Sequence, residues 1–334
     1  MKKFLIIPFI LLSISLQAQF FIESETQVTV KPIDGLYIDE NFENKGTLTL
    51  EADGSTEVIF DGNYKNTDGI VAFNDNVFRI GSGNSDSNSI VTLDFNPLGE
   101  TVGRMIVDKT GGSADGQSGT IDVTTSLTME DIGALNAENQ VILISNSSNT
   151  AVVEPSNPNA VAKVTVQRHF FPSSNNTPNP PIRAFRLVSP SVTSSGTIHR
   201  DWQEGATSWN DTAVDDGFGI HITGNNTSQT DNSLNNGLDW NPSGNPSMFE
   251  YDNINNNGWS AVTITDDNDP LTVTDHLEAQ KPYLVMVRGA RITGGIAFDI
   301  TSSDTDATVT TLRAKGELQF GDNIAAPLNN GSEE

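Results

Sequence analysis

The amino-acid sequence predicts an all-β protein with a parallel β-helix-like N-terminal region followed by a β-sandwich domain. Three observations support this prediction. Apolar segments are short and alternate with polar residues, turn-forming Gly, Asn and Asp separate them, and few segments are long enough for three helical turns. Of 334 residues, 28 are glycine and 36% are hydrophobic. We expect under about a tenth of the residues in helix, against roughly a third in an average globular protein.

The first 18 residues have the pattern of a secretory signal peptide. Lys2 and Lys3 precede an apolar run at residues 4–12, and Ala18 supplies the small residue before a cleavage site. The run is shorter than the roughly 20 residues that span a bilayer. We therefore predict cleavage after Ala18, a mature chain beginning at Gln19, and no membrane-spanning segment.

Residues 19–171 contain short β segments separated by dense turn signals such as Asp53-Gly54 and Asp61-Gly62. β-branched residues and two-residue alternation favour strands. Strands that recur every 10–20 residues or so without helical crossovers fit either a parallel β-helix or a sandwich. We prefer the β-helix, because its stacked coils accept irregular loops and polar corners, although no strict repeat is visible. The expected strands are 47–50, 57–60, 70–73, 77–80, 90–95, 105–107, 120–123, 140–144 and 163–166.

A second β domain is expected at residues 182–322, after a polar linker at 172–181 and before a polar tail at 323–334. It holds all four tryptophans and longer apolar strands, which are typical of a sandwich with its own core. A short helix is expected at 197–205, with Thr197 as its cap, and a helical turn at 275–278. The expected strands are 183–188, 219–223, 248–251, 261–264, 271–273, 283–288, 296–300 and 309–313.

The charge and residue content exclude several classes of function. With 18 Lys+Arg and 43 Asp+Glu the formal charge is −25, or −27 without Lys2 and Lys3, so nucleic acid is not an expected partner. The chain has no cysteine and therefore no disulfide.

No catalytic pattern stands out from the composition. The four histidines form no metal-binding pair, and we expect His221 to be an outward-facing strand residue. In a chain this acidic, acidic residues close together in the sequence, such as Asp201 with Glu204 and Asp215 with Asp216, arise by chance. We expect no enzyme activity.

Two ligand sites are expected from residue chemistry. Ca²⁺ binds carboxylate and amide oxygens, and Asp266, Asp267 and Asp269 supply several within one loop, as a structural calcium site. No other cofactor is predicted. Aromatic rings among Asn, Asp and Gly suit sugar stacking, for which the candidates are Trp209, Trp240 and Trp259, with Tyr251 nearby. The alternative for these tryptophans is packing between sheets.

The second half resembles a β-rich module of large secreted surface proteins of Bacteroidetes, mainly flavobacteria. The resemblance implies export, often by the type IX secretion system, which reads a C-terminal sorting domain. No catalytic residue carries over. This chain departs from the family pattern because no sorting domain follows Gly316. We therefore expect a longer natural protein, and an uncovered last sheet edge in this chain. The segments that carry the resemblance are 183–192, 198–205, 219–224, 239–249 and 281–289.

These observations together predict a secreted or cell-surface, non-enzymatic protein that serves adhesion or acts as a structural scaffold. Its location would be extracellular or on the outer cell surface, and its partner an extracellular glycan or a surface protein. The alternative is a polysaccharide-binding or polysaccharide-degrading surface protein. A carboxylate pair lining a groove would favour the degrading enzyme.

Overall fold

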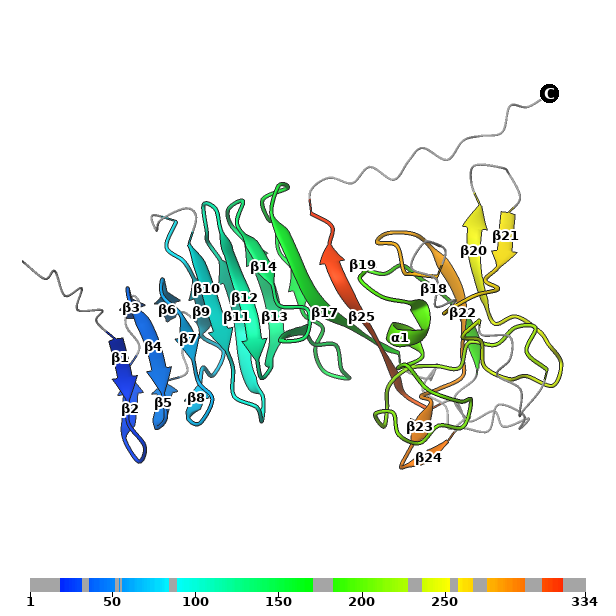
Figure 1. Cartoon of the computed structure of the whole chain (residues 1–334), viewed down its shortest axis with the longest axis horizontal. Coiled ribbons are helices and arrows are strands. Elements are labelled where there is room, and N and C mark those ends of the chain that lie inside the picture. The colour runs from blue at the N-terminus through cyan, green and yellow to red at the C-terminus, as the bar shows by residue number, and fades with distance from the viewer. Residues whose placement is uncertain are drawn as a thin grey trace, which may run out of the picture.

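The computed structural model describes residues 19–31, 36–51, 54, 56–83, 89–170, 183–227, 236–252, 258–266, 275–297 and 308–320. It is nearly all β structure, which confirms the predicted class, and its N-terminal half is a parallel β-solenoid of about six turns. Figure 1 shows the solenoid strands side by side, from blue to green. The predicted signal peptide lies outside the described residues. Within them, no helix has the length and apolar character needed to cross a membrane.

Three stacks of parallel strands form the walls of the solenoid. The first contains β1 (Gln19–Ile22), β4 (Asn41–Asn44), β7 (Tyr64–Lys65), β10 (Ile90–Asp94), β12 (Ser113–Ser118), β14 (Ala134–Asn136) and β17 (Val161–Phe170). The second contains β3 (Leu36–Ile38), β6 (Glu57–Phe60), β9 (Val77–Ile80), β11 (Glu100–Val107), β13 (Ile121–Met129), β15 (Val141–Leu143) and again β17, with β16 (Val152–Val153) beside β13. The third contains β2 (Gln27–Val30), β5 (Thr47–Leu50) and β8 (Ile70–Ala72).

Each short strand turns alternate side chains into the solenoid. In β5, Leu48 and Leu50 are buried while the two threonines lie nearer the surface, as the two-residue side-chain period requires. The coils differ in length. Val58 and Phe78, which pair in successive coils, are 20 positions apart in the sequence. Tyr64 and Leu93, another such pair, are 29 positions apart. This variation explains why no strict repeat is visible in the sequence.

Aromatic rings fill the first coils of the solenoid. Phe42 and Tyr64 occupy paired positions in successive coils and stack at 5.3 Å between ring centroids. In the second stack Phe60 and Phe78 are diagonal neighbours in successive coils, and their tilted rings pack with centroids 5.2 Å apart. Such ring pairs contribute about 0.5–1.5 kcal/mol beyond the area that they bury. Because each ring contacts the next coil, the aromatic residues help to set the register of the stack.

A buried polar ladder runs beside the aromatic rings. Asn44 donates from Nδ2 to Oδ1 of Asn66 at 2.8 Å, and Asn66 donates in turn to Oε1 of Glu100 at 3.0 Å. The Tyr64 hydroxyl donates to Oε2 of Glu100 at 2.6 Å, and the Asn96 backbone N–H donates to Oε1 at 2.8 Å. The ladder satisfies polar groups that would be costly to bury alone. It therefore links successive coils through side chains as well as through the backbone.

Glu100 makes the stability of the solenoid sensitive to pH. Burial raises the pKa of this carboxyl above its ordinary value of 4.5, so the folded chain holds the proton more tightly than the unfolded chain does. The stability that the proton provides is fully present below about pH 4.5 and is lost as the pH rises through the raised folded pKa. We expect Glu100→Gln, which does not titrate, to gain stability relative to the wild type across that window. The gain should be about 1.4 kcal/mol for each unit by which the pKa is raised.

Urea unfolding of the wild type and Glu100→Gln at a series of pH values measures this difference. Glu154→Gln on the surface is the control for the loss of one negative charge. A difference between wild type and Glu100→Gln that stays constant from about pH 4 to about pH 8 would contradict the expectation.

A strand from the far end of the chain covers the last edge of the solenoid. β25 (Thr310–Leu318) pairs antiparallel with β17 from Lys163 opposite Glu317 to Phe170 opposite Thr310. On its other side it pairs with β19 (Val192–Ser194). In Figure 1, β25 lies between the solenoid and the second half of the molecule. A strand of the second half therefore covers this edge of β17.

The second half, which we call the head (residues 183–320), is built around one antiparallel sheet in the order β18-β22-β20-β21. Its other regular elements are small. The elements are β18 (Ala184–Val188), β20 (Met248–Asp252), β21 (Gly258–Ala261), β22 (Tyr283–Val287), the hairpin of β23 (Ile292–Thr293) and β24 (Ile296–Ala297), and the helix α1 (Ile198–Trp202). Within the part of the head that the structure describes, the other strand pairings are the β23–β24 hairpin and the pairing of β19 with β25, and these pairings do not establish a second sheet packed on this one. The predicted sandwich is therefore not confirmed.

Several local predictions can be compared with the head. Thr197 caps α1 as predicted, accepting from the Arg200 backbone N–H at 3.1 Å. The segment 219–223 is not a strand, since only Thr223 within it forms a β-bridge, to Asp239. Residues 275–278 form no helical turn, and His276 instead bridges to Thr197. The predicted linker 172–181 and tail 323–334 lie outside the described residues.

Candidate functional site

The four-stranded sheet of the head has one buried face and one open face. Tyr283, Val285 and Met248 point inward and are almost fully buried. The residues between them point to the other side, and the strand register aligns them across all four strands. We call these outward residues the sheet face. They are Phe185, Leu187, Leu284, Met286, Phe249, Tyr251, Trp259 and Ala261.

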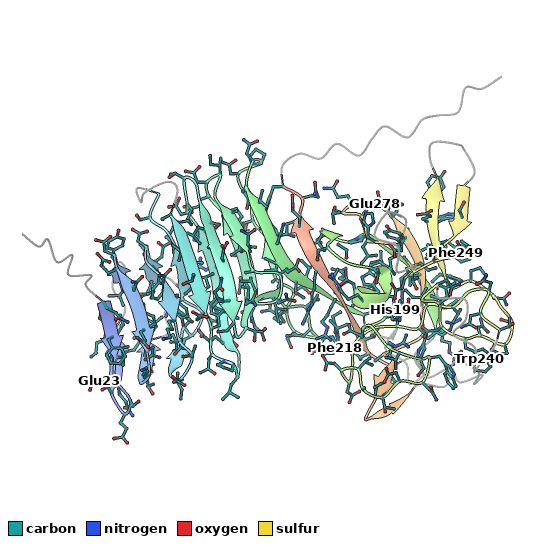
Figure 2. The ribbon with its side chains drawn as sticks, viewed as in Figure 1. Glu23, His199, Phe218, Trp240, Phe249 and Glu278 are labelled. Atoms are coloured by element: carbon teal, nitrogen blue, oxygen red, sulfur yellow. The ribbon has the colours of Figure 1, made fainter. Side chains whose placement is uncertain are left out.

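The sheet face is apolar yet exposed to solvent. Leu187 is 67% exposed, Phe185 and Trp259 are each 43% exposed, and Tyr251 is 37% exposed. Large apolar residues that lie side by side on a surface mark interaction sites more often than isolated ones do. Figure 1 places β20 and β21 at the end of the molecule away from β1, and Figure 2 shows Phe249 there. The face is therefore well separated from the first solenoid coil.

Cross-strand ring pairs organise the sheet face. Tyr251 and Trp259 lie directly opposite each other, with ring centroids 5.3 Å apart and planes at 65°. Phe185 and Phe249 meet at 5.9 Å and 61°. Edge-to-face packing of this kind holds the rings in place. The face therefore presents aromatic groups whose orientation is largely set before any ligand arrives.

A groove adjoins the sheet face at the junction with the solenoid. Its volume is about 650 Å³, and its lining includes Val152 and Phe170 from the solenoid side and Leu187 and Pro190 from the head. Leu187 belongs to both surfaces. The apolar surface thus continues from the sheet into the groove.

A buried ion pair supports the head. Arg291 donates from Nη1 to Oδ2 of Asp239 at 2.7 Å and from Nη2 to Oδ1 at 2.9 Å. Gln203 donates to the same Asp239 Oδ2 at 3.0 Å. Two-point pairing of this kind fixes both side chains, because the planar guanidinium matches the carboxylate. The pair ties the loop around Asp239 to the segment that follows β22.

His221 belongs to this buried centre, so the prediction that it faces outward is wrong. It is almost fully buried, and its Nε2 donates to the Trp209 carbonyl at 2.7 Å. Burial lowers its pKa to about 4, so the ring is neutral at pH 7. The Gly-Ile-His-Ile-Thr sequence resembles an alternating strand, but the segment lies in the interior, where its polar groups bond to neighbouring loops.

Of the four acidic residues considered above for catalysis, three contact arginines, whereas Asp216 accepts from the Gly294 backbone N–H at 3.0 Å. Glu204 and Asp215 both accept hydrogen bonds from Arg313, and Asp201 accepts from Arg200 Nε at 2.9 Å. Burial raises the pKa of both Asp201 and Glu204. Asp201, Glu204 and Asp215 therefore each have a cationic partner, as expected of structural ion pairs.

The calcium prediction is only partly covered by the structure. The carboxylate oxygen Oδ2 of Asp266 lies 3.7 Å from Nδ1 of His199. Asp267 and Asp269 lie outside the described residues. Across the described ranges, no three His, Asp or Glu side chains form a group suited to a metal ion. The calcium site thus stays a prediction.

The three predicted glycan tryptophans have different surroundings. Trp240 is only 8% exposed, and its Nε1 donates to the Thr227 carbonyl at 3.0 Å. Trp209 packs against it at 5.1 Å and is half-buried. Trp259 alone among the three lies on the sheet face. Trp240 and Trp209 therefore pack together in the head, whereas Trp259 has a ring open to a ligand.

The other members of the sheet face were not singled out as site residues. The sequence pattern that could have indicated them is the strand at 283–287, Tyr-Leu-Val-Met-Val, which is apolar at every position. In an antiparallel sheet with one face in water, alternation with polar residues is expected. A strand without this alternation of apolar and polar residues predicts either that a second sheet covers its other face or that this face is apolar and open to solvent.

Comparison with known proteins found no match. No family model, curated protein or solved structure is similar to this chain.

Proposed function

We propose that this chain is a non-enzymatic protein of the cell exterior that attaches to polysaccharide through the sheet face of its head. The solenoid is the rigid base on which the head is held. The observation that carries the proposal is the exposed, pre-oriented Tyr251–Trp259 pair within a continuous apolar face. Export follows from the signal-peptide pattern of residues 1–18.

Polysaccharide suits this surface for a chemical reason. A pyranose ring presents C–H groups on one face, and these pack against aromatic rings while its hydroxyls stay in water or bond to nearby polar groups. The sheet face extends across four paired strands, which suits a chain of sugars better than a single compact ligand. The neighbouring groove extends the contact area past Leu187.

A surface protein is the second candidate partner. Tyr, Trp, Phe and Met are enriched at the centres of protein interfaces, and Phe185, Phe249 and Met286 give part of the sheet face that character. Adhesion through a protein would use the same surface. If no glycan binds in the test below, a protein is the remaining candidate partner.

A binding role, without catalysis, is supported by the acidic residues. Asp201, Glu204 and Asp239 are the buried acids of the head considered above, and each contacts an arginine. Such pairs stabilise a fold and leave the carboxylate poorly placed to transfer protons to a substrate. Release of reducing ends from a polysaccharide panel would contradict the non-enzymatic part of the proposal.

We expect Trp259→Ala to weaken polysaccharide binding about tenfold or more, since an aromatic contact worth about 1.4 kcal/mol corresponds to a factor of ten. Tyr251→Ala should act in the same direction. Phe21→Ala is the matched control, because Phe21 is an equally exposed aromatic residue on the solenoid. A glycan array identifies ligands, and isothermal titration measures affinities of the three variants. The proposal fails if no glycan binds, or if Trp259→Ala and Tyr251→Ala both bind as the wild type does.

A further inference from the structure

The first coil of the solenoid, formed by β1, β2 and β3, has an uncovered edge. Each of these strands pairs on one side with a strand of the next coil, β4, β5 and β6 respectively. Among the described residues, no strand pairs with the other side. At the far end of the solenoid, by contrast, β25 covers β17. In Figure 1 the first coil is the dark blue end of the molecule, away from the head.

The side chains that point into the first coil are less covered than their counterparts one coil later. Phe20 stacks on Phe42 with ring centroids 5.9 Å apart and planes at 17°. Phe20 is nevertheless 39% exposed, whereas Phe42 is 1% exposed. Val28 is only partly buried, whereas its paired residue Leu48 is fully buried. One further layer of apolar side chains would therefore complete the core at this end.

The backbone of the first coil presents hydrogen-bonding groups along the open edge. The carbonyls of Ile22 and Val30 accept from backbone N–H groups of the second coil, at 2.8 Å and 2.9 Å. Because the backbone groups of successive strand residues point to opposite edges, those of Phe21 and Thr29 face the open side. Such an edge is a template for a strand of another chain.

The three strands lack the residues that usually protect an open edge. Charged side chains and proline on edge strands discourage pairing between molecules. The strands read Gln-Phe-Phe-Ile, Gln-Val-Thr-Val and Leu-Tyr-Ile. None of these residues is charged or proline, in a chain of which 18% is charged. This composition favours an edge that is covered in the mature protein.

A second copy of this chain fits the open edge. Cleavage after Ala18 would make Gln19, the first residue of β1, the N-terminus, so the mature chain would have no preceding segment to cover the coil. A copy cannot stack through its last coil, because β25 occupies that edge. The remaining arrangement places first coil against first coil about a twofold axis, which is closed and uses the same surface on both copies.

We propose that the mature protein forms a symmetric dimer in which β1 of each copy pairs antiparallel with β1 of the other, with the twofold axis at Phe21. Opposed residues of an antiparallel pair point to the same face of the sheet. This register sets Phe20 opposite Ile22 of the second copy, so side chains directed at the core meet. A register centred on Phe20 would instead leave Ile22 opposite the removed Ala18. The same rotation brings β2 of each copy to β3 of the other, so all three walls are covered.

The interface is small, and the dimer is expected to be reversible. The strands of the first coil have three or four residues each, whereas a standard interface uses roughly 20–30 residues per partner. We therefore expect a dissociation constant of about 1–10 µM and monomers at nanomolar concentration. The two heads of the dimer lie at its opposite ends. If each head binds polysaccharide, one dimer can bridge two polysaccharide chains.

Sedimentation velocity of the mature chain from about 0.1 to 100 µM measures the association. We expect a shift from monomer to dimer across that range. Phe21→Pro should raise the dissociation constant at least about tenfold, because it removes an N–H that faces the open edge and keeps the ladder to β4. Phe21→Ala is the matched control, since it keeps this N–H and should still dimerise. Trp259→Ala should also dimerise, which excludes association through the sheet face. Far-UV circular dichroism confirms that each variant folds.

The register is tested by cross-linking, which does not require the proline variant to fold. The chain has no cysteine, so a single introduced thiol is specific. Opposed Cα atoms in a hydrogen-bonded antiparallel pair are about 5.5 Å apart, so a short bismaleimide should join two copies of Phe21→Cys. Tyr37→Cys is the control. It lies on β3, which faces β2 of the other copy, so its two thiols are far apart and should not be joined.

These outcomes do not depend on glycan binding, so the dimer and the proposed function can fail separately. A mature chain that stays monomeric up to about 100 µM overturns the dimer. A dimer that forms equally well in folded Phe21→Pro shows that another surface associates. A dimer in which Tyr37→Cys is cross-linked and Phe21→Cys is not overturns the pairing of β1 with β1.

Discussion

Asp239→Asn is expected to lower the free energy of unfolding by about 3–5 kcal/mol, the range found when one partner of a buried ion pair is removed. Asp239 is 6% exposed and Arg291 is 1% exposed, so water cannot replace the lost charge. The Ile222 backbone N–H also donates to the carboxylate, at 2.9 Å. The substitution leaves a buried guanidinium without its counter-ion and puts an amide N–H₂ where acceptors are needed.

Urea unfolding at neutral pH measures this loss. Lys65→Met is the control, because it removes an ion pair with Glu43 in which the lysine is 48% exposed, and surface pairs contribute about 0–1 kcal/mol. The double variant Asp239→Leu with Arg291→Met should recover part of the loss, since no buried charge then stands alone. A loss under about 1 kcal/mol in Asp239→Asn would show that the centre tolerates an unpaired arginine.

The second large effect is expected when β25 is removed. A chain that ends at residue 308 leaves β17 with eight residues of unpaired strand edge, from Lys163 to Phe170, and removes the buried Leu312, Ala314 and Leu318. Long open edges pair with other chains. We therefore expect this chain to elute as oligomers or aggregates in size-exclusion chromatography with light scattering. A chain that ends at residue 320 keeps β25 and should behave as the full-length protein does.

A point substitution tests the same contact without shortening the chain. Gly316 lies in β25 between β17 and β19, and a Cβ there would clash with the Thr193 carbonyl. Gly316→Val should therefore displace β19 from β25 and lower stability, whereas Lys315→Val beside it should be tolerated. If the shortened chain stays monomeric and Gly316→Val is as stable as wild type, β25 is not needed to cover the solenoid.

Most solenoid strands with strong alternation were predictable from the sequence. The expected strands at 47–50, 57–60 and 77–80 match β5, β6 and β9. Some of the missed strands are polar, such as β12 with the sequence Ser-Ala-Asp-Gly-Gln-Ser. In a stack, both edges of a strand are paired by the neighbouring coils, so one small buried residue such as Ala114 is enough. Propensity alone does not identify such strands.

The architecture of the head was harder to predict for a physical reason. Apolar residues on both faces of the 283–287 strand favour a sandwich, which the described residues do not confirm. The pairing of β17 with β25 joins residues about 150 positions apart, and no local pattern encodes that contact. Trp259 was predicted as a ligand-binding residue from the composition of the sequence around it. Its partners on the sheet face became evident only from the strand register.

The solenoid is short for the number of residues that it contains. Stacked strands are about 4.8 Å apart, so the seven strands from β1 to β17 span about 29 Å. The same residues, 19–170, in one α-helix would extend over about 230 Å. The solenoid therefore provides little reach, and whatever holds the first coil is kept within a few nanometres of the head. A greater distance would require more coils, each made of 20 or more residues, so this design suits close attachment between two surfaces.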